Sequence, residues 1–192
     1  MHYVALVLIP ADGDVDTRVA EAMHPYDENR EIEKATDEDG EVYWTNPVSF
    51  WDWWQVGGRW TGLLSGYDPD ADPALTERCW LCHGTGRRDD EVGRRARERN
   101  PAYGCNGCNG KGRSRMWPTE WPRRDDDVMP AAAALAALRD DPEKAPSTFV
   151  VHDSEHVAED VGGMVALIER TIVARHAAGH DGDRIVVVDY HC

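Results

Sequence analysis

Apolar residues along the chain fall into short continuous runs and into stripes with helical spacing. Two runs, Tyr3–Ile9 and Ile185–Tyr190, are almost continuously apolar, which is typical of strands covered on both faces of a sheet. A shorter run, Thr148–Val151, is flanked by polar residues and predicts a third strand. Glu41–Thr45 alternates in polarity and carries two aromatic residues, so it predicts an edge or hairpin strand.

Helical stripes lie between these runs. Asp14 can cap a first helix, and Ala131–Leu138 has the high helix propensity of a second. The longest stripe predicts a third helix, capped by Asp153 or Ser154 and stopped near Gly179. Its apolar positions share one face: Val157, Val161, Met164, Val165, Ile168 and Ile172. Strand–helix–strand order at both ends predicts an α+β fold, either ferredoxin-like or a small open α/β sandwich.

The composition is that of a folded chain. The 192 residues, 41% hydrophobic and 30% charged, suffice for one domain or for one domain and a small module, and they exclude a fully disordered protein. The net charge of −15 argues against a general nucleic-acid coat protein. Eighteen arginines against three lysines indicate GC-rich coding and favour a bacterium or its phage as the source.

The N-terminal apolar run is too short to cross a bilayer and follows no cationic segment. No other run approaches about 18 apolar residues, the usual length of a spanning helix. We therefore expect a cytoplasmic protein without membrane contact. In that reducing compartment, cysteines serve metals more often than disulfides.

Two segments, Cys79–Gly86 and Cys105–Gly112, repeat the pattern Cys-x-x-Cys-x-Gly-x-Gly. Each pair of cysteines can present two thiolates to one metal, so the repeats predict one structural Zn²⁺ per chain in a tetrahedral site. The four expected ligands are Cys79, Cys82, Cys105 and Cys108. Four thiolates leave no coordination position open, which favours structural over catalytic zinc.

Two alternatives concern the remaining donors near these repeats. His83 follows the first pair and can replace one thiolate. Cys192 is expected to be a free thiol, with a terminal ligand pair of His191 and Cys192 as the other interpretation.

The repeats resemble the cysteine-rich zinc region of DnaJ-type co-chaperones, in which four such units form two zinc sites. Here two units cover about 35 of the 192 residues. No His-Pro-Asp tripeptide of a J-domain is present, because a tyrosine interrupts the segment His24–Asp27. The resemblance therefore implies a zinc-finger-like module without co-chaperone activity.

Charge sets this segment apart from the rest of the chain. Residues 78–124 hold 12 Lys and Arg against 5 Asp and Glu, a net charge of +7, whereas residues 1–77 and 125–192 carry −22. We expect an α+β body formed by the two flanking ranges and an inserted basic zinc module over 78–124. The acidic runs Asp68–Asp72 and Asp125–Asp127 are interpreted as solvated linkers at its borders.

Arginines beside aromatic residues suit phosphate contact together with base stacking. The predicted partner of the module is a nucleic acid or a host protein, and docking on the acidic body is the intramolecular alternative. The candidate contact residues are Arg87, Arg88, Arg94, Arg95, Arg97, Arg113, Arg115 and Trp117.

A tryptophan-rich segment, Phe50–Gly62, contains four of the eight tryptophans. Its aromatic residues can form core on helix faces, which is the usual explanation of such clustering. The other interpretation is a ligand pocket, in which glycine N–H groups and an arginine bind an anion and a tryptophan stacks on a planar group. The pocket residues would be Trp51, Trp54, Gly57, Gly58 and Arg59.

The Trp-Asp-Trp and Gly-Gly-Arg-Trp elements of this segment, together with the upstream His24–Asn29, resemble a group of uncharacterised phage and bacterial proteins. This resemblance covers about the first half of the chain and implies one functional unit over residues 24–62.

Our main functional hypothesis is a non-enzymatic zinc-binding accessory protein. The alternative is an enzyme acting on a nucleotide or nucleic acid, with four candidate working groups: His24, Asp27, Asp52 and Arg59. Polar residues around position 152 offer a weaker metal site, for which capping and solvation are the simpler explanation. They are His152, Asp153, Glu155 and His156.

Overall fold

The computed structural model describes residues 1–118, 120–152, 157–158 and 161–192. The chain divides into two compact units. The sheet unit comprises Met1–Tyr67 and Trp121–Cys192, and the cysteine unit comprises Asp68–Glu120. The sequence-based border at residue 78 falls on the last residue of a strand, β5 (Thr76–Arg78). The border at residue 124 lies beyond Glu120, where the cysteine unit ends.

The helices and strands of the sheet unit match the apolar runs only in part. They are β1 (His2–Ile9), α1 (Val15–Met23), β2 (Glu33–Thr36), β3 (Val42–Thr45), β4 (Trp53–Val56), β7 (Val128–Pro130), α3 (Ala131–Asp140), β8 (Thr148–Val151), β9 (Val157–Ala158), α4 (Val161–Ala177) and β10 (Arg184–His191). Short 3-10 turns lie at His24–Tyr26, Gly58–Trp60, Asp125–Asp127 and Pro142–Lys144.

A mixed sheet with the strand order β4-β10-β1-β8-β9 forms the centre of this unit, and β7 also pairs with β10. The two long apolar strands are neighbours: β1 runs antiparallel to β10 and parallel to β8. The fold is thus α+β, as the sequence predicted, whereas the ferredoxin-like arrangement is not confirmed by this strand order.

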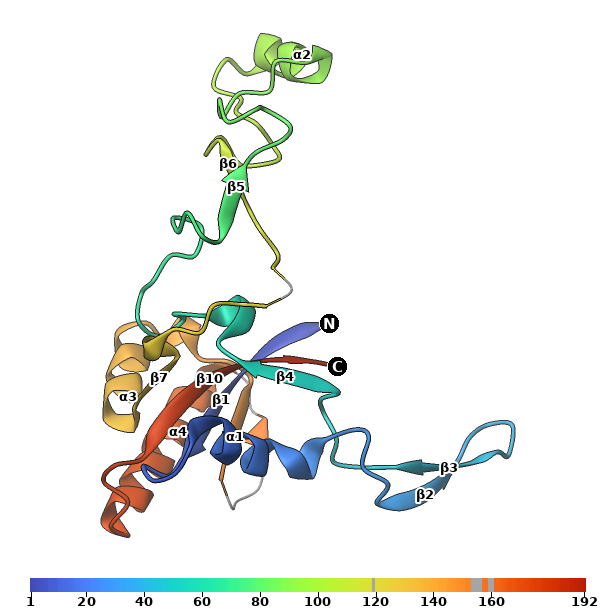
Figure 1. Ribbon diagram of the computed structural model, residues 1–192, viewed down its shortest axis with the longest axis vertical. Helices are drawn as coiled ribbons and strands as arrows, with labels where there is room; N and C mark the ends of the chain where they lie inside the picture. Colours follow the sequence, from blue (N-terminus) through green and yellow to red (C-terminus); the bar gives the residue numbers. More distant parts are fainter. Residues whose placement is uncertain (119, 153–156, 159–160) are drawn as a thin grey trace. The chain divides into compact units, whose positions relative to one another are not determined.

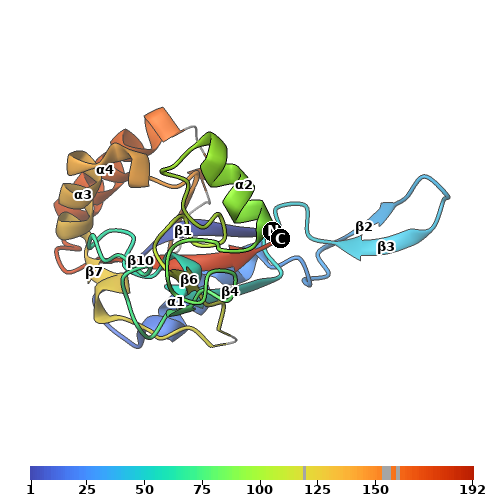
Figure 2. The ribbon, with the colours of Figure 1, turned by 90° about the horizontal axis from the view of Figure 1, so that it is seen from above.

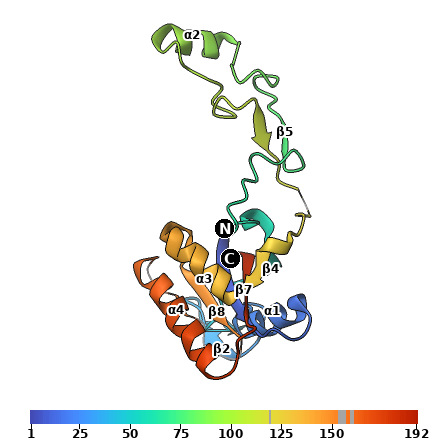
Figure 3. The same cartoon turned by 90° about the vertical axis from the view of Figure 1, so that its left-hand side faces the viewer.

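Helices cover the sheet on both faces (Figure 3). On one face, alternate residues of β1 and β10 such as Leu6 and Val187 pack with Leu138 of α3 and Ile168 of α4. On the other face, the intervening residues pack against α1, where Val19 and Met23 are fully buried. Burial on both faces explains why these strands are almost continuously apolar.

Two sequence predictions about the helices have different outcomes. The first helix begins after Asp14, whose side chain accepts a hydrogen bond from Thr17 N at 3.0 Å, as predicted. The last helix begins only at Val161, and Val157 belongs to strand β9, so the predicted stripe was too long. The predicted caps Asp153 and Ser154 lie outside the described residues.

The tryptophan-rich segment is a strand and not the helix that its spacing allowed. Residues of β4 pair antiparallel with β10, with Trp54 opposite Tyr190. The segment ends in a loop at Gly57–Gly62, which three glycines with positive φ allow to turn sharply: Gly57, Gly58 and Gly62. The predicted hairpin strand Glu41–Thr45 is also present, as β3 paired with β2 in an arm that projects from the sheet unit (Figure 2).

Short elements make up the cysteine unit (Figure 1). They are β5 (Thr76–Arg78), α2 (Glu91–Arg99) and β6 (Arg113–Arg115), and β5 pairs with β6. None of the described helices in either unit has the length and apolar content needed to cross a bilayer.

Candidate metal centre

The four cysteines of the two repeats lie together, with all sulfur atoms within 4.8 Å of one another and all four side chains buried. The sulfurs of Cys79 and Cys105 are 3.9 Å apart, and those of Cys82 and Cys108 are 3.7 Å apart. Four sulfurs at about 2.3 Å from one tetrahedral Zn²⁺ lie about 3.8 Å from each other. The separations are far beyond the roughly 2 Å of a disulfide bond, so the cluster fits one metal ion.

The two repeats hold each other by reciprocal backbone contacts. Cys79 N donates to the carbonyl of Gly112 at 3.0 Å, and Cys105 N donates to the carbonyl of Gly86 at 2.8 Å. Each bond joins the first cysteine of one repeat to the last glycine of the other. The repeats, offset by 26 residues, therefore form a pseudo-symmetric pair around the sulfur cluster.

Glycine is required where the repeats meet. A methyl group on Gly86 would lie 2.3 Å from the Gly110 carbonyl oxygen, and one on Gly112 would lie 2.5 Å from the Gly84 carbonyl oxygen. All four glycines have positive φ. The repeated glycines thus permit both the turn and the close approach, and Gly112 N lies 3.2 Å from the Cys108 sulfur as a donor.

The thiols differ in how readily they ionise. A hydrogen bond from the Ser114 side chain lowers the pKa of the Cys79 thiol to about 6. Burial raises the pKa of Cys105 and raises the pKa of Cys108 to about 11. Since burial opposes thiolate formation at two of the four positions, a bound cation would supply the compensating charge.

The two alternative donors lie elsewhere. His83 is exposed, has a φ of 50°, and is not part of the sulfur cluster. Cys192 is an exposed free thiol in the sheet unit. The cluster accordingly contains the four cysteines that the spacing predicted.

Arginines of the cysteine unit are partly neutralised by nearby acids. Arg88 pairs with Asp90 at 2.6 Å, Arg95 with Glu91 at 2.6 Å, and Arg115 lies 3.9 Å from a carboxylate oxygen of Asp70. Within Asp68–Glu120 there are ten Lys and Arg against nine Asp and Glu, a net charge of +1. The net charge of +7 over residues 78–124 depends on leaving out the four acids between Asp68 and Glu77 and on including Arg123 and Arg124, which belong to the sheet unit.

Other candidate contact residues lie on the surface or brace the fold. Arg87 and Arg94 are exposed and form no ion pair within the part of the chain that the structure describes. The guanidinium of Arg97 donates to the Arg88 carbonyl, and that of Arg113 donates to Thr76 at 2.8 Å. Trp117 is 61% exposed, and Arg115 lies over its ring at 5.5 Å.

The proposed pocket residues of the tryptophan-rich segment contribute to the fold. Trp51 is buried against α1, and its indole N–H donates to the Met23 carbonyl at 2.9 Å. Trp54 packs against the same cluster. The backbone N–H of Arg59 donates to the Asp189 carboxylate at 3.0 Å, which fixes the Gly57–Gly62 loop against β10.

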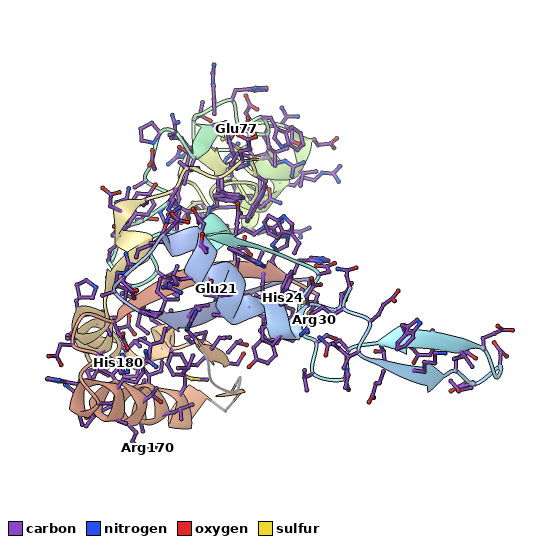
Figure 4. All side chains as sticks on the ribbon, turned by 60° about the horizontal axis from the view of Figure 1, so that its bottom comes forward. Glu21, His24, Arg30, Glu77, Arg170 and His180 are labelled. Atoms are coloured by element: carbon purple, nitrogen blue, oxygen red, sulfur yellow. The ribbon has the colours of Figure 1, made fainter. Side chains whose placement is uncertain are left out.

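The four candidate working groups of the enzyme hypothesis have different surroundings. His24 is exposed at the end of α1 (Figure 4), and Asp27 accepts hydrogen bonds from the backbone and side chain of Asn29. Asp52 accepts a hydrogen bond from His191 Nδ1 at 2.9 Å, and the backbone N–H of Arg59 donates to Asp189. In the weaker site near residue 152, His152 contacts Glu21 at 3.0 Å, and the other three candidates lie outside the described residues.

Two buried carboxylates were not recognised in the sequence. Asp127, interpreted as part of a solvated linker, is fully buried and accepts from Thr61 Oγ1 and Gly62 N, both at 2.7 Å. Asp189 is also fully buried and accepts from His2 Nδ1 at 2.9 Å. An acid inside the apolar run Ile185–Tyr190 was the available signal for the second; nothing local distinguished Asp127 from its neighbours.

Comparison with known proteins identifies no relative of this chain. No family model, no curated protein and no solved structure matches the chain.

Proposed function

We propose that this chain is a zinc-binding accessory protein whose cysteine unit is folded by one structural Zn²⁺ and binds a nucleic acid. The observation that carries the proposal is the set of four buried sulfurs within 4.8 Å of one another. A thiolate set of this kind is closed, so the metal supplies folding energy and not a reactive position. The resemblance of the repeats to DnaJ-type zinc regions supports the same choice of metal.

Local charge favours a nucleic acid as the partner. Helix α2 contains four arginines in nine residues, of which Arg94, Arg95 and Arg99 are exposed, and Arg95 pairs with Glu91. Trp80 is 74% exposed within the first repeat and offers a stacking surface. Because the unit as a whole carries only +1, we expect contact through this local cluster and not through long-range attraction.

The zinc assignment is tested by metal analysis of the purified protein. We expect close to one zinc per chain, and its loss in the double variant Cys79→Ser/Cys105→Ser. The variant Cys192→Ser, which alters a thiol outside the cluster, should keep its zinc. A folded cysteine unit without metal would contradict the proposal.

The partner is tested by fluorescence anisotropy with a labelled single-stranded RNA or DNA over a series of salt concentrations. Replacing Arg94 and Arg99 with alanine should weaken binding and lower the salt slope by about 0.7 for each phosphate that the protein no longer neutralises. Arg170→Ala, an exposed arginine on α4 (Figure 4), is the matched control and should leave binding unchanged. If zinc is bound but nucleic acid is not, a host protein becomes the favoured partner.

A further inference from the structure

The apolar face of the central sheet ends in a polar patch at one end of three adjacent strands. On β1 and β10, Leu6 and Val187 face each other in the core. One pair farther along the same face, Asp189 lies opposite Val4 on β1 and Gln55 on β4. The last row places His191 between His2 and Trp53. Since alternate residues share a face, the sheet register itself brings two histidines side by side.

Each of these histidines is held by a carboxylate. His2 Nδ1 lies 2.9 Å from Asp189 Oδ1, and His191 Nδ1 lies 2.9 Å from both carboxylate oxygens of Asp52. The side chain of Asp189 is fully buried, whereas His2 and His191 are 23% and 40% exposed. The patch therefore has one buried acid, Asp189, one partly exposed acid, Asp52, and two imidazoles that solvent can reach.

The carboxylates determine which imidazole nitrogen is available. An ionised carboxylate only accepts hydrogen bonds, so Nδ1 carries the proton in both histidines. In the neutral ring the lone pair is then on Nε2. Within the described residues, neither Nε2 atom has a hydrogen-bond partner. The two rings lie 5.3 Å apart between centroids at an interplanar angle of 65°.

The geometry points to a second metal site, in the sheet unit, where His2 and His191 bind one divalent transition-metal ion through Nε2. Histidine ligands of metals typically donate their other N–H to a carboxylate, as both do here. Two imidazoles bound to one ion with tetrahedral geometry and metal–nitrogen distances of about 2.0–2.1 Å have centroids roughly 5 Å apart. The ion class is that which prefers imidazole, such as Zn²⁺, Ni²⁺ or Cu²⁺.

This site differs in kind from the thiolate cluster and does not depend on the proposed function of the cysteine unit. Two protein ligands leave coordination positions open for water or for an anionic oxygen donor. We therefore expect a weaker and exchangeable metal, with a ligand class of carboxylates or phosphates at the open positions.

The experiment is a calorimetric titration of the zinc-loaded protein with Ni²⁺. Zinc is supplied at one equivalent per chain, which fills the tighter four-thiolate cluster first and leaves the histidine pair for Ni²⁺. We expect one Ni²⁺ per chain, and loss of binding in each of the single variants His2→Ala and His191→Ala. Asp52→Asn should weaken Ni²⁺ binding by about 10–100-fold, because the amide holds the imidazole less firmly.

Controls separate this pair from other donors. His24→Ala and His180→Ala change exposed histidines elsewhere on the same unit (Figure 4), and Cys192→Ser changes the exposed thiol next to His191; all three should bind Ni²⁺ normally. Thermal melting of every variant checks that the sheet unit remains folded.

Two results would overturn the inference. One is the absence of Ni²⁺ binding by the folded, zinc-loaded protein. The other is Ni²⁺ binding that survives either His2→Ala or His191→Ala. If only His2→Ala removes binding, the ion is held by the first residues of the chain and not by the pair.

Discussion

The two units of this protein are stabilised by different means. In the sheet unit, fully buried side chains from two apolar clusters cover both faces of a mixed sheet. In the cysteine unit, the buried cluster consists of the four cysteines, with Leu81 packed against it. A small unit with so little apolar surface to bury cannot offset its conformational entropy by the hydrophobic effect alone. The comparison indicates that the proposed metal would do in the cysteine unit what the hydrophobic core does in the sheet unit.

Removal of the metal is expected to have the largest effect of the changes that distinguish the two units. Treatment with a chelator, or the double variant Cys79→Ser/Cys105→Ser, should unfold the cysteine unit, because a structural zinc contributes about 10–16 kcal/mol of apparent folding energy. The sheet unit should keep its melting temperature. Proteolysis with mass mapping measures the unfolding, with cleavage expected within Asp68–Glu120, and thermal melting measures the stability of the sheet unit. Loss of the sheet unit as well would show that the two are not independent.

A core truncation should give the reverse pattern. Phe149 is fully buried in β8, and Phe149→Ala should destabilise the sheet unit by about 3–5 kcal/mol, because it removes buried apolar surface and leaves a cavity. Zinc content and resistance of the cysteine unit to proteolysis should not change. Urea denaturation followed by tryptophan fluorescence measures the destabilisation, and Val173→Ala, at a 59% exposed position of α4, is the control.

How far the sequence could predict this structure also differs between the units. The grouping of the four cysteines follows from local spacing, because two Cys-x-x-Cys turns need only one closing contact to form a set that can hold a tetrahedral metal. Strands β1 and β10 follow from their apolar runs, because burial on both faces leaves few polar positions. Local patterns suffice for both.

Features that depend on strand pairing were not predictable in this way. His2 and His191 come together because β1 and β10 are antiparallel neighbours in a particular register, which no segment of either strand encodes alone. The aromatic residues of β4 fitted a helix as well as a strand. The burial of Asp127 depends on a distant loop, since its partners Thr61 and Gly62 precede it by more than 60 residues.

The smallest expected effect concerns the glycines of the two repeats. It tests whether they, in addition to the cysteines, stabilise the cysteine unit. Gly86 and Gly110 both have positive φ, so alanine at either position costs about 1–2 kcal/mol of backbone strain. They differ in their surroundings: a methyl group on Gly86 would meet the Gly110 carbonyl oxygen at 2.3 Å, whereas one on Gly110 has its nearest neighbour at 3.9 Å. Gly86→Ala should therefore weaken zinc affinity more than Gly110→Ala, which a competition titration with a chromogenic chelator measures. Equal effects of the two substitutions would mean that backbone strain alone lowers the zinc affinity. The close approach of the two repeats would then contribute nothing to it.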